Sequence, residues 1–278
     1  MFQVQKAFIK SGRTLIHLDI PPADEEVLPN TKWGDVAGFP TVAYWLFKVL
    51  EQRLTSTRIK YKLGNSLLEE VGACLLGGHG IPAANGIAAF EHMKSKNVFD
   101  GTIYSEEQLF SWLSEPIKLT DRTFKYRFAK QKSKYLHCAI KKIAKNSAPQ
   151  KSGKSLRNWL TEINGIGLKT ASWVARNWLD ADDVAILDIH IYRAGILGGF
   201  FNEKMNVEKH YLALEEQFIS LAKSMEVSTA ELDAIIWFEM QDSSSVHKLL
   251  SLRENGSVNL DRSSTNKHRT NPYQTALI

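Results

Sequence analysis

The spacing of apolar residues predicts a chain that is mainly α-helical. From Pro40 onward, apolar side chains recur every three or four positions, which is the period of a helix with one buried face. Two of the expected helices begin with recognisable signals: Ser105 precedes two glutamates, and Ser228 with Glu231 has the spacing of a capping box. The pattern predicts ten helices, over residues 40–57, 64–77, 83–96, 105–114, 126–146, 155–163, 168–180, 189–197, 207–225 and 229–241.

The two ends of the chain lack this period. Residues 1–20 partly alternate between apolar and polar side chains around a Ser-Gly pair, which predicts a β-hairpin, and a proline-rich polar connector follows. Residues 251–278 are polar and aperiodic, and we expect them to be disordered or loosely packed. The chain is therefore expected to comprise an extended N-terminal segment with its connector at 1–39, a helical core at 40–250 and this polar tail.

The composition is that of a globular chain and not of a membrane protein. Hydrophobic residues make up 44% of the chain and charged residues 23%. The longest uncharged run, Val71–Phe90, has about the length of a membrane span, but its five glycines and its proline predict a buried helix, a break and a second helix. The N-terminus also lacks the apolar segment of a signal peptide.

The cysteine content excludes two kinds of metal site. Cys74 and Cys138 are too few for a four-cysteine iron–sulfur cluster or for a cysteine-based zinc site. So low a number fits a reducing compartment, and we expect both residues to be buried apolar side chains.

Positive charge is concentrated in one stretch. The net charge is only +5, yet between Arg122 and Thr161 there is no Asp or Glu while twelve Lys and Arg occur. A solvated face ordinarily mixes both signs, so a stretch of one sign favours a polyanionic partner. Nucleic acid fits better than a membrane, because turns interrupt the stretch. A solvent-exposed face without a partner is the alternative.

The end of this stretch runs into the sequence SLRNWLTEI-NGIG-LKTASWVARNW, which predicts two short helices joined by a tight turn. Gly165 and Gly167 permit positive φ angles and a close approach of the backbone. The amides of the turn and of the following helix would then face outward and bind phosphate, together with Lys151 and Lys154 of the basic stretch. A plain helix–helix turn is the alternative, but the neighbouring positive charge favours a clamp on the DNA backbone.

The second helix of this hairpin has an unusual polar face. On a helical wheel, Lys169, Trp173 and Arg176 fall together, away from the side expected to pack into the core. A large aromatic side chain in that place must be covered by another part of the chain or by a ligand. The expected core side consists of Leu168, Ala171, Ala175, Trp178 and Leu179.

Asp188 interrupts an apolar run, with VAIL before it and IHI after it. It directly precedes a predicted helix, so its carboxylate is expected to accept hydrogen bonds from the first free amides of that helix. This role explains the residue without any further function. It also holds an ionised carboxylate at a defined position.

The hairpin, Lys169 and the aspartate nineteen residues later together resemble the helix–hairpin–helix (HhH-GPD) superfamily of DNA glycosylases, and within it the bifunctional 8-oxoguanine DNA glycosylases with AP lyase activity. The match is close over about residues 155–197. Adenine-specific members lack the lysine, and endonuclease III-like members usually have cluster-binding cysteines that are missing from this sequence. The resemblance implies a two-lobed helical fold, with the hairpin at 155–180 and an active-site cleft between the lobes.

The chemistry of base excision gives each of the two charges a role. Cleavage of the N-glycosidic bond develops positive charge at C1′ of the sugar, which the Asp188 carboxylate would stabilise. Lys169, with its amine partly neutral, would attack C1′ and hold the opened sugar as a Schiff base. β-Elimination of the 3′ phosphate would then nick the strand, and the reaction needs no metal.

The target base must leave the duplex to be reached. Trp173 offers one aromatic face. Asp233 and Trp237, four residues apart on the last predicted helix, offer an acceptor and a second face, as in one archaeal branch of the family. A carboxylate can accept the paired N1–H and N2–H₂ donors of guanine, which adenine and thymine lack. The alternatives are that Trp237 belongs to the core and that Asp233 is a solvated helix residue.

Two further residues enter through the resemblance. His190 matches a position that contacts the phosphate beside the flipped nucleotide, and Asn85 would fill the space that the flipped base leaves. The N-terminal part has no match to the residues that sense the 8-oxo change at N7, so the lesion itself stays open.

The resemblance implies double-stranded DNA with a damaged or modified base as the partner. It implies no cofactor and no iron–sulfur cluster, and it admits a structural monovalent cation at the hairpin. We expect a monomer that binds no membrane, in the cytoplasm with the nucleoid in a bacterium or archaeon, or in the nucleus of a eukaryote.

Three functions remain open at this point. The first is removal of an oxidised guanine, with 8-oxoguanine as the simplest choice. The second is removal of another modified base, such as a modified purine of phage DNA or an oxidised pyrimidine. The third is a non-catalytic hairpin module that binds DNA, in which Lys169 only contacts phosphate.

Overall fold

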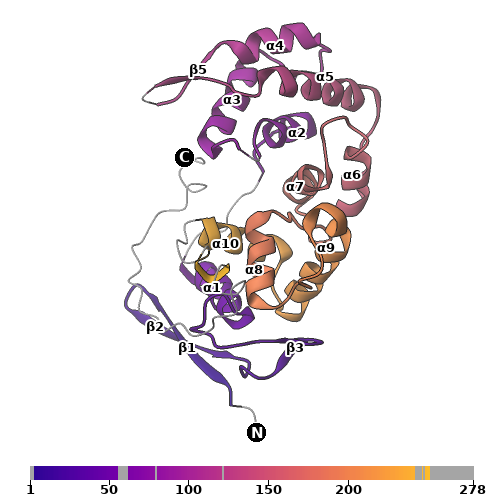
Figure 1. Cartoon of the computed structure of the whole chain (residues 1–278). Helices are drawn as coiled ribbons and strands as arrows, with labels where there is room; N and C mark the ends of the chain where they lie inside the picture. The colour runs from indigo at the N-terminus through magenta and orange to yellow at the C-terminus, as the bar shows by residue number, and fades with distance from the viewer. Residues whose placement is uncertain are drawn as a thin grey trace. The chain divides into compact units, whose positions relative to one another are not determined.

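The fold is described from a computed structural model of the chain, which defines residues 3–55, 62–78, 80–120, 122–241, 246 and 248–250 (Figure 1). Helices dominate, and all ten predicted helices are present with ends that differ by a few residues. No helix in this described part is long and apolar enough to cross a membrane. The predicted polar tail lies outside the described residues.

The chain divides into two compact units. Unit 1 combines both ends of the chain, Met1–Lys60 and Leu187–Ile278, whereas unit 2 is the continuous segment Tyr61–Ile186. The second boundary falls between the two charges that the sequence singles out. Lys169 therefore belongs to unit 2 and Asp188 to unit 1.

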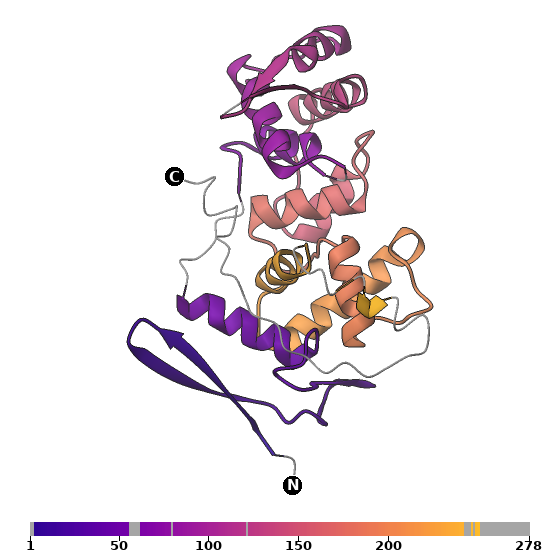
Figure 2. The same ribbon diagram turned by 60° about the vertical axis from the view of Figure 1, so that its left-hand side comes forward.

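Unit 1 begins with the predicted hairpin. Strands β1 (Gln5–Ser11) and β2 (Thr14–Ile20) pair antiparallel over their full length. Ala7 and Ile9 are buried, and β1 contacts α1 (Val42–Thr55). In both views α1 lies between the hairpin and helix α10 (Figures 1 and 2).

The other helices of unit 1 follow residue 187. Helix α8 packs against α10, and α10 packs against α1 and α9. At the predicted capping box before α10, the Ser228 amide donates to Oε2 of Glu231 at 3.1 Å, and Oγ of Ser228 accepts from the amide of Ala230 at 3.1 Å. These helices are α8 (Ile189–Gly198), α9 (Val207–Ser224) and α10 (Thr229–Gln241).

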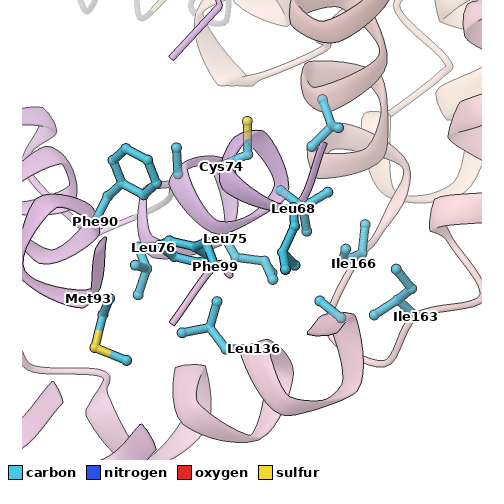
Figure 3. Packing of buried hydrophobic residues seen from close by; sticks show 14 of the residues in the cluster. Leu68, Cys74, Leu75, Leu76, Phe90, Met93, Phe99, Leu136, Ile163 and Ile166 are labelled. Atoms are coloured by element: carbon cyan, nitrogen blue, oxygen red, sulfur yellow. The ribbon is translucent and has the colours of Figure 1, made fainter. Parts of the chain in front are cut away.

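Unit 2 is built around α2, which contacts α3, α5 and α7. Its buried cluster includes Leu75, Leu76, Met93 and Leu136, which come from three different helices (Figure 3). Cys74 is buried in this cluster and Cys138 packs against it. The helices are α2 (Leu67–Leu76), α3 (Ala83–Ser95), α4 (Glu106–Ser114), α5 (Ala129–Lys145), α6 (Gly153–Leu160) and α7 (Leu168–Leu179). The uncharged run 71–90 thus forms a helix, a break and a second helix, as predicted.

The sequence patterns missed two small antiparallel pairs. Strand β3 (Glu26–Leu28) pairs with β4 (Thr31–Lys32) in the polar connector, and β5 (Pro116–Lys118) pairs with β6 (Thr123–Lys125) before α5. Strands of two or three residues are too short to show an alternation of apolar and polar positions.

Candidate active site

The predicted helix–turn–helix is formed by α6 and α7, and its two glycines have different roles. Gly165 has φ +89, and a Cβ there would lie 2.1 Å from the ring of Tyr135 on α5. Only glycine therefore allows the turn to rest on this ring. Gly167 has φ −87 and ψ 175, so it does not use the positive φ that a glycine permits. Its backbone is extended because it is the N-cap of α7.

The starts of α6 and α7 differ in how their amides are satisfied. At α6, Ser152 and Ser155 form a capping box, and the Asp183 carboxylate accepts from the amides of Gly153 at 2.9 Å and Lys154 at 3.1 Å. At α7, the N-cap glycine has no side chain to accept a hydrogen bond, and it lies on the surface. The start of α7 is therefore the one suited to an external anion.

The basic stretch forms a row of lysines on α5. Lys130, Lys134, Lys141 and Lys145 are all exposed, and their spacing places them within about 60° of one another on the helix. The buried residues of α5, such as Leu136 and Ile140, lie on the other side. Arg122, Lys125, Arg127 and Lys151 are exposed too.

Four members of the stretch depart from this pattern, among them Lys154, which is half-buried, and Arg157, which is only 4% exposed. Lys132 is half-buried, and burial lowers the pKa of its amine. Lys142 is half-buried as well and pairs with the Glu162 carboxylate just beyond the stretch.

Lys169 lies in the first turn of α7 and is half-buried. The helical wheel is wrong about Arg176, which is only 7% exposed and so does not share an exposed face with Lys169. Ser172, Val174 and Asn177 are buried too, because α7 is enclosed on more sides than one apolar stripe would allow. Only two of the five expected core residues, Ala171 and Ala175, are fully buried.

Trp173 is half-buried and packs against the core cluster of unit 2. A Cβ on Gly77, just after α2, would lie 3.4 Å from Cη2 of this indole. Another part of the chain therefore covers part of the Trp173 ring, which is the first of the two alternatives given for this residue.

A buried carboxylate holds α7 to α2. Glu70 is fully buried, and its Oε1 accepts from Nδ2 of Asn177 at 2.7 Å. Its Oε2 accepts from the amides of Leu63 at 2.7 Å and Gly64 at 2.8 Å. Burial, and next the charge of Glu70, raise the pKa of the Cys74 thiol, while the Arg176 charge acts in the opposite sense. One carboxylate thus joins the start of unit 2 to the helix that carries Lys169.

Asp188 is the N-cap of α8, as predicted. Its Oδ1 accepts from the amides of His190 at 2.8 Å and Ile191 at 3.0 Å, and the residue is 8% exposed. Both capping bonds use the same oxygen. The second oxygen, Oδ2, takes no part in the cap.

The other predicted residues of unit 1 gather on α8 and α10. The rings of His190 and Trp237 meet edge to face, with centroids 6.4 Å apart and an interplanar angle of 81°. Asp233 is only 4% exposed, so it is not a solvated helix residue. Trp237 is half-buried and does not belong to the fully buried core.

The sequence reasoning missed Glu70 and Asp183. Glu70 is the second of two glutamates between Leu68 and Val71, which is a weaker form of the signal that singled out Asp188. Asp183 lies in a loop and carries no comparable signal. Asn85 is half-buried in the first turn of α3, where its amide donates to the carbonyl of Pro82.

Comparison with known proteins shows the family of the chain. The sequence model of the 8-oxoguanine DNA glycosylase family (Ogg-HhH) matches residues 50–227. This range contains the hairpin, Lys169, Asp188 and His190, whereas α10 lies beyond it.

Individual relatives point the same way. The 8-oxoguanine DNA glycosylase/AP lyase of Saccharolobus islandicus is 33% identical over 135 residues, which are 45% of this chain and 64% of the relative, so the chain spans less than two thirds of it. The protein of the same name from Aquifex aeolicus is 29% identical over 65% of this chain and 77% of the relative.

A solved structure is also similar. The 8-oxoguanine DNA glycosylase of Methanocaldococcus jannaschii superposes with a TM-score of 0.51 at 25% identity, over 64% of this chain and 78% of that protein. The family model covers well over half of this chain and includes both charges that the sequence singled out. The chain therefore belongs to the 8-oxoguanine DNA glycosylase family.

Proposed function

We propose that the protein is a DNA glycosylase with AP lyase activity that removes an oxidised guanine, first of all 8-oxoguanine, from double-stranded DNA. The observation that carries the proposal is the Asp188 cap. It holds a carboxylate in a fixed orientation at the start of α8 while Oδ2 takes no part in the cap. Lys169 stands directly after the hairpin, both residues lie within the range that the family model matches, and relatives of this chain are named for this activity.

The two charges divide the reaction between them. As the N-glycosidic bond breaks, its electron pair leaves with the base, and the Asp188 carboxylate stabilises the positive charge that develops at C1′. Nζ of Lys169, in its neutral form, forms a bond to C1′, loses a proton and opens the sugar to a protonated imine. Loss of a proton from C2′ then expels the 3′ phosphate and nicks the strand.

The DNA backbone is bound by positive groups of both units. In unit 2 these are the amides around Gly165 and Gly167, the lysine row of α5, and the side chains of Lys151 and Lys154. In unit 1 His190 serves the phosphate beside the flipped nucleotide. The row on α5 extends about 22 Å along the helix, enough to meet several phosphates of one strand.

The base is read by α10. Asp233 is a carboxylate with 4% exposure on this helix, and the two oxygens of a carboxylate can accept the side-by-side N1–H and N2–H₂ donors of guanine. Trp237 and Trp173 provide aromatic faces for the ring. Asp233 and Trp237 lie beyond the range that the family model matches, so base recognition is tested separately from the chemistry.

Borohydride trapping tests the chemistry. The wild-type protein, mixed with an 8-oxoguanine duplex and borohydride, should form a covalent adduct with DNA because the reagent reduces the imine. The adduct should vanish in Lys169→Gln and persist in Lys204→Gln, which removes an exposed lysine far along the chain. No adduct on any damaged duplex would refute the lyase assignment.

Two duplexes test the reading of the base. Asp233→Asn and Trp237→Ala should lose excision of 8-oxoguanine while they still nick a duplex that already holds an abasic site. Equal loss on both duplexes would contradict a role in base reading. A panel of other modified purines and oxidised pyrimidines, each opposite the four bases, then decides between 8-oxoguanine and another lesion.

A further inference from the structure

Helix α10 is tied to α1 near both of its ends. At its start, the Arg53 guanidinium donates to both oxygens of Glu231, from Nε to Oε1 at 2.9 Å and from Nη2 to Oε2 at 2.7 Å. Near its end, Oε2 of Glu239 accepts from the Tyr44 hydroxyl at 3.1 Å, and its Oε1 lies 3.3 Å from Nζ of Lys48. Both ties lie within unit 1.

These ties attach to the side of α10 that lies opposite its predicted base-reading residues. At about 100° per residue, Glu231 and Glu239 lie about 80° apart, and Asp233 and Trp237 lie about 40° apart. The centres of the two pairs are then about 180° from each other. One face of α10 is therefore held by α1, and the opposite face carries Asp233 and Trp237, with Trp237 against His190 of α8.

The tie near the end of α10 is partly shielded from water. The side chain of Lys48 is 18% exposed and that of Glu239 is 26% exposed. Burial alone would lower the pKa of Lys48, but its hydrogen bond to Glu51 and the charge of Glu239 raise it. Burial, followed by the charge of Glu239, raises the pKa of Tyr44. Lys48 therefore stays charged and Tyr44 stays a donor at neutral pH.

Helix α1 is itself firmly placed. Trp45 is fully buried, and its ring packs edge to face with those of Tyr44, at 5.0 Å, and Phe39, at 5.6 Å. Because Tyr44 belongs to this aromatic cluster, its hydroxyl is presented to Glu239 from a rigid side chain. The contacts of Tyr44 and Lys48 with Glu239 therefore fix the position of α10 relative to α1.

We propose that Tyr44, Lys48 and Arg53 are positioning residues for base recognition, which fix the rotation of α10 so that Asp233 and Trp237 meet the flipped base. The inference rests on the proposed function. A binding site works only when its side chains are held to within about 0.5 Å and about 10–20°. Tyr44, Lys48 and α10 lie outside the range that the family model matches, whereas Arg53 lies inside it, so the device extends beyond that range.

The experiment compares two duplexes with variants of the clamp. Tyr44→Phe removes only the hydroxyl, Glu239→Gln removes the charge, and Arg53→Gln breaks the other tie. Glu26→Gln is the control, because Glu26 is an exposed glutamate of unit 1 on β3 and belongs to neither α1 nor α10. Single-turnover excision of 8-oxoguanine and nicking of an abasic duplex are measured side by side, with thermal melting to confirm folding.

Excision of 8-oxoguanine should fall about tenfold in the folded clamp variants, since a small displacement of a binding group has an effect of that order. Nicking of the abasic duplex should stay within about twofold, because no base is read there, and Glu26→Gln should match the wild type on both duplexes. Arg53→Lys should recover part of the loss caused by Arg53→Gln.

Two results would overturn the inference. Unchanged excision in every clamp variant would show that α10 does not depend on the ties, and equal losses on both duplexes would show a purely structural role. A wild-type protein that acts on neither duplex would instead refute the proposed function, and this inference with it.

Discussion

Helices α7 and α10 both carry residues predicted for the active site, but the protein holds them by different means. Helix α7 is held from within, since the fully buried Glu70 bonds Asn177 and two backbone amides. Helix α10 is held by ion pairs with α1 that lie nearer the surface. The side chains in these pairs are between 18% and 40% exposed.

The difference follows from what each helix presents. Helix α7 carries the lysine that we propose forms the covalent bond, and a buried network shielded from solvent holds this helix. Helix α10 carries the residues that we propose read the base, and salt and pH can reach the ion pairs that hold it. Buried ionic groups couple strongly to stability, whereas exposed pairs contribute little. The predictions below test this contrast.

The largest effect is expected from Glu70→Ala. The change leaves two amides and Asn177 without their acceptor in the core, and should lower the free energy of unfolding by about 3–5 kcal/mol. Urea unfolding followed by circular dichroism measures it. Glu69→Gln is the control, because Glu69 is next in sequence but bonds Lys94 and Asn65 near the surface, and it should cost about 1 kcal/mol.

A smaller loss is expected from Asn177→Ala. Glu70 keeps its two backbone donors in this variant, so the free energy of unfolding should fall by about 1–3 kcal/mol. The double variant with Glu70→Ala should lose less than the sum of the two single changes, since both remove the same hydrogen bond. Strict additivity would show that the two residues act separately.

The ties of α10 should contribute less to stability than to function. Arg53→Gln and Glu239→Gln should each lower the free energy of unfolding by at most about 1 kcal/mol. In about 1 M salt, where the screening length is about 3 Å, the loss from Arg53→Gln should largely disappear while the loss from Glu70→Ala persists. If salt reduced the loss in the free energy of unfolding equally in both variants, the contrast between the two helices would be wrong.

The smallest effect concerns alkaline pH. Because burial and then Glu239 raise the pKa of Tyr44, the unfolded tyrosine ionises above about pH 10 while the folded one keeps its proton. The free energy of unfolding should therefore fall as pH rises through that range, by less than about 1 kcal/mol per pH unit from this residue. Tyr44→Phe should flatten the slope in unfolding curves between about pH 9 and 11.

Unit 2 offers a parallel for that measurement. Burial alone raises the pKa of Tyr126, whose hydroxyl donates to the carbonyl of Leu76 at 2.7 Å. Tyr126→Phe should flatten the same slope without any change in salt dependence, because no ion pair is involved. A slope that neither substitution alters would rule out both tyrosines as its source.

Sequence spacing alone determined the helices, the N-terminal hairpin and the Asp188 cap. Each of these depends on residues within a few positions of one another. The period of a helix, the period of a strand and the pattern of a cap can all be recognised over such short stretches of sequence. The short pairs β3–β4 and β5–β6 were missed because they contain too few residues to show a period.

Tertiary structure alone decided which sides of α7 are buried, and so why Arg176 does not share the exposed face of Lys169. It also decided the polar ties behind the two helices. Glu70 and Asn177 are 107 positions apart, and Arg53 and Glu231 are 178 apart. No local period relates residues at such separations, because only the packing of whole helices brings their side chains within hydrogen-bonding distance.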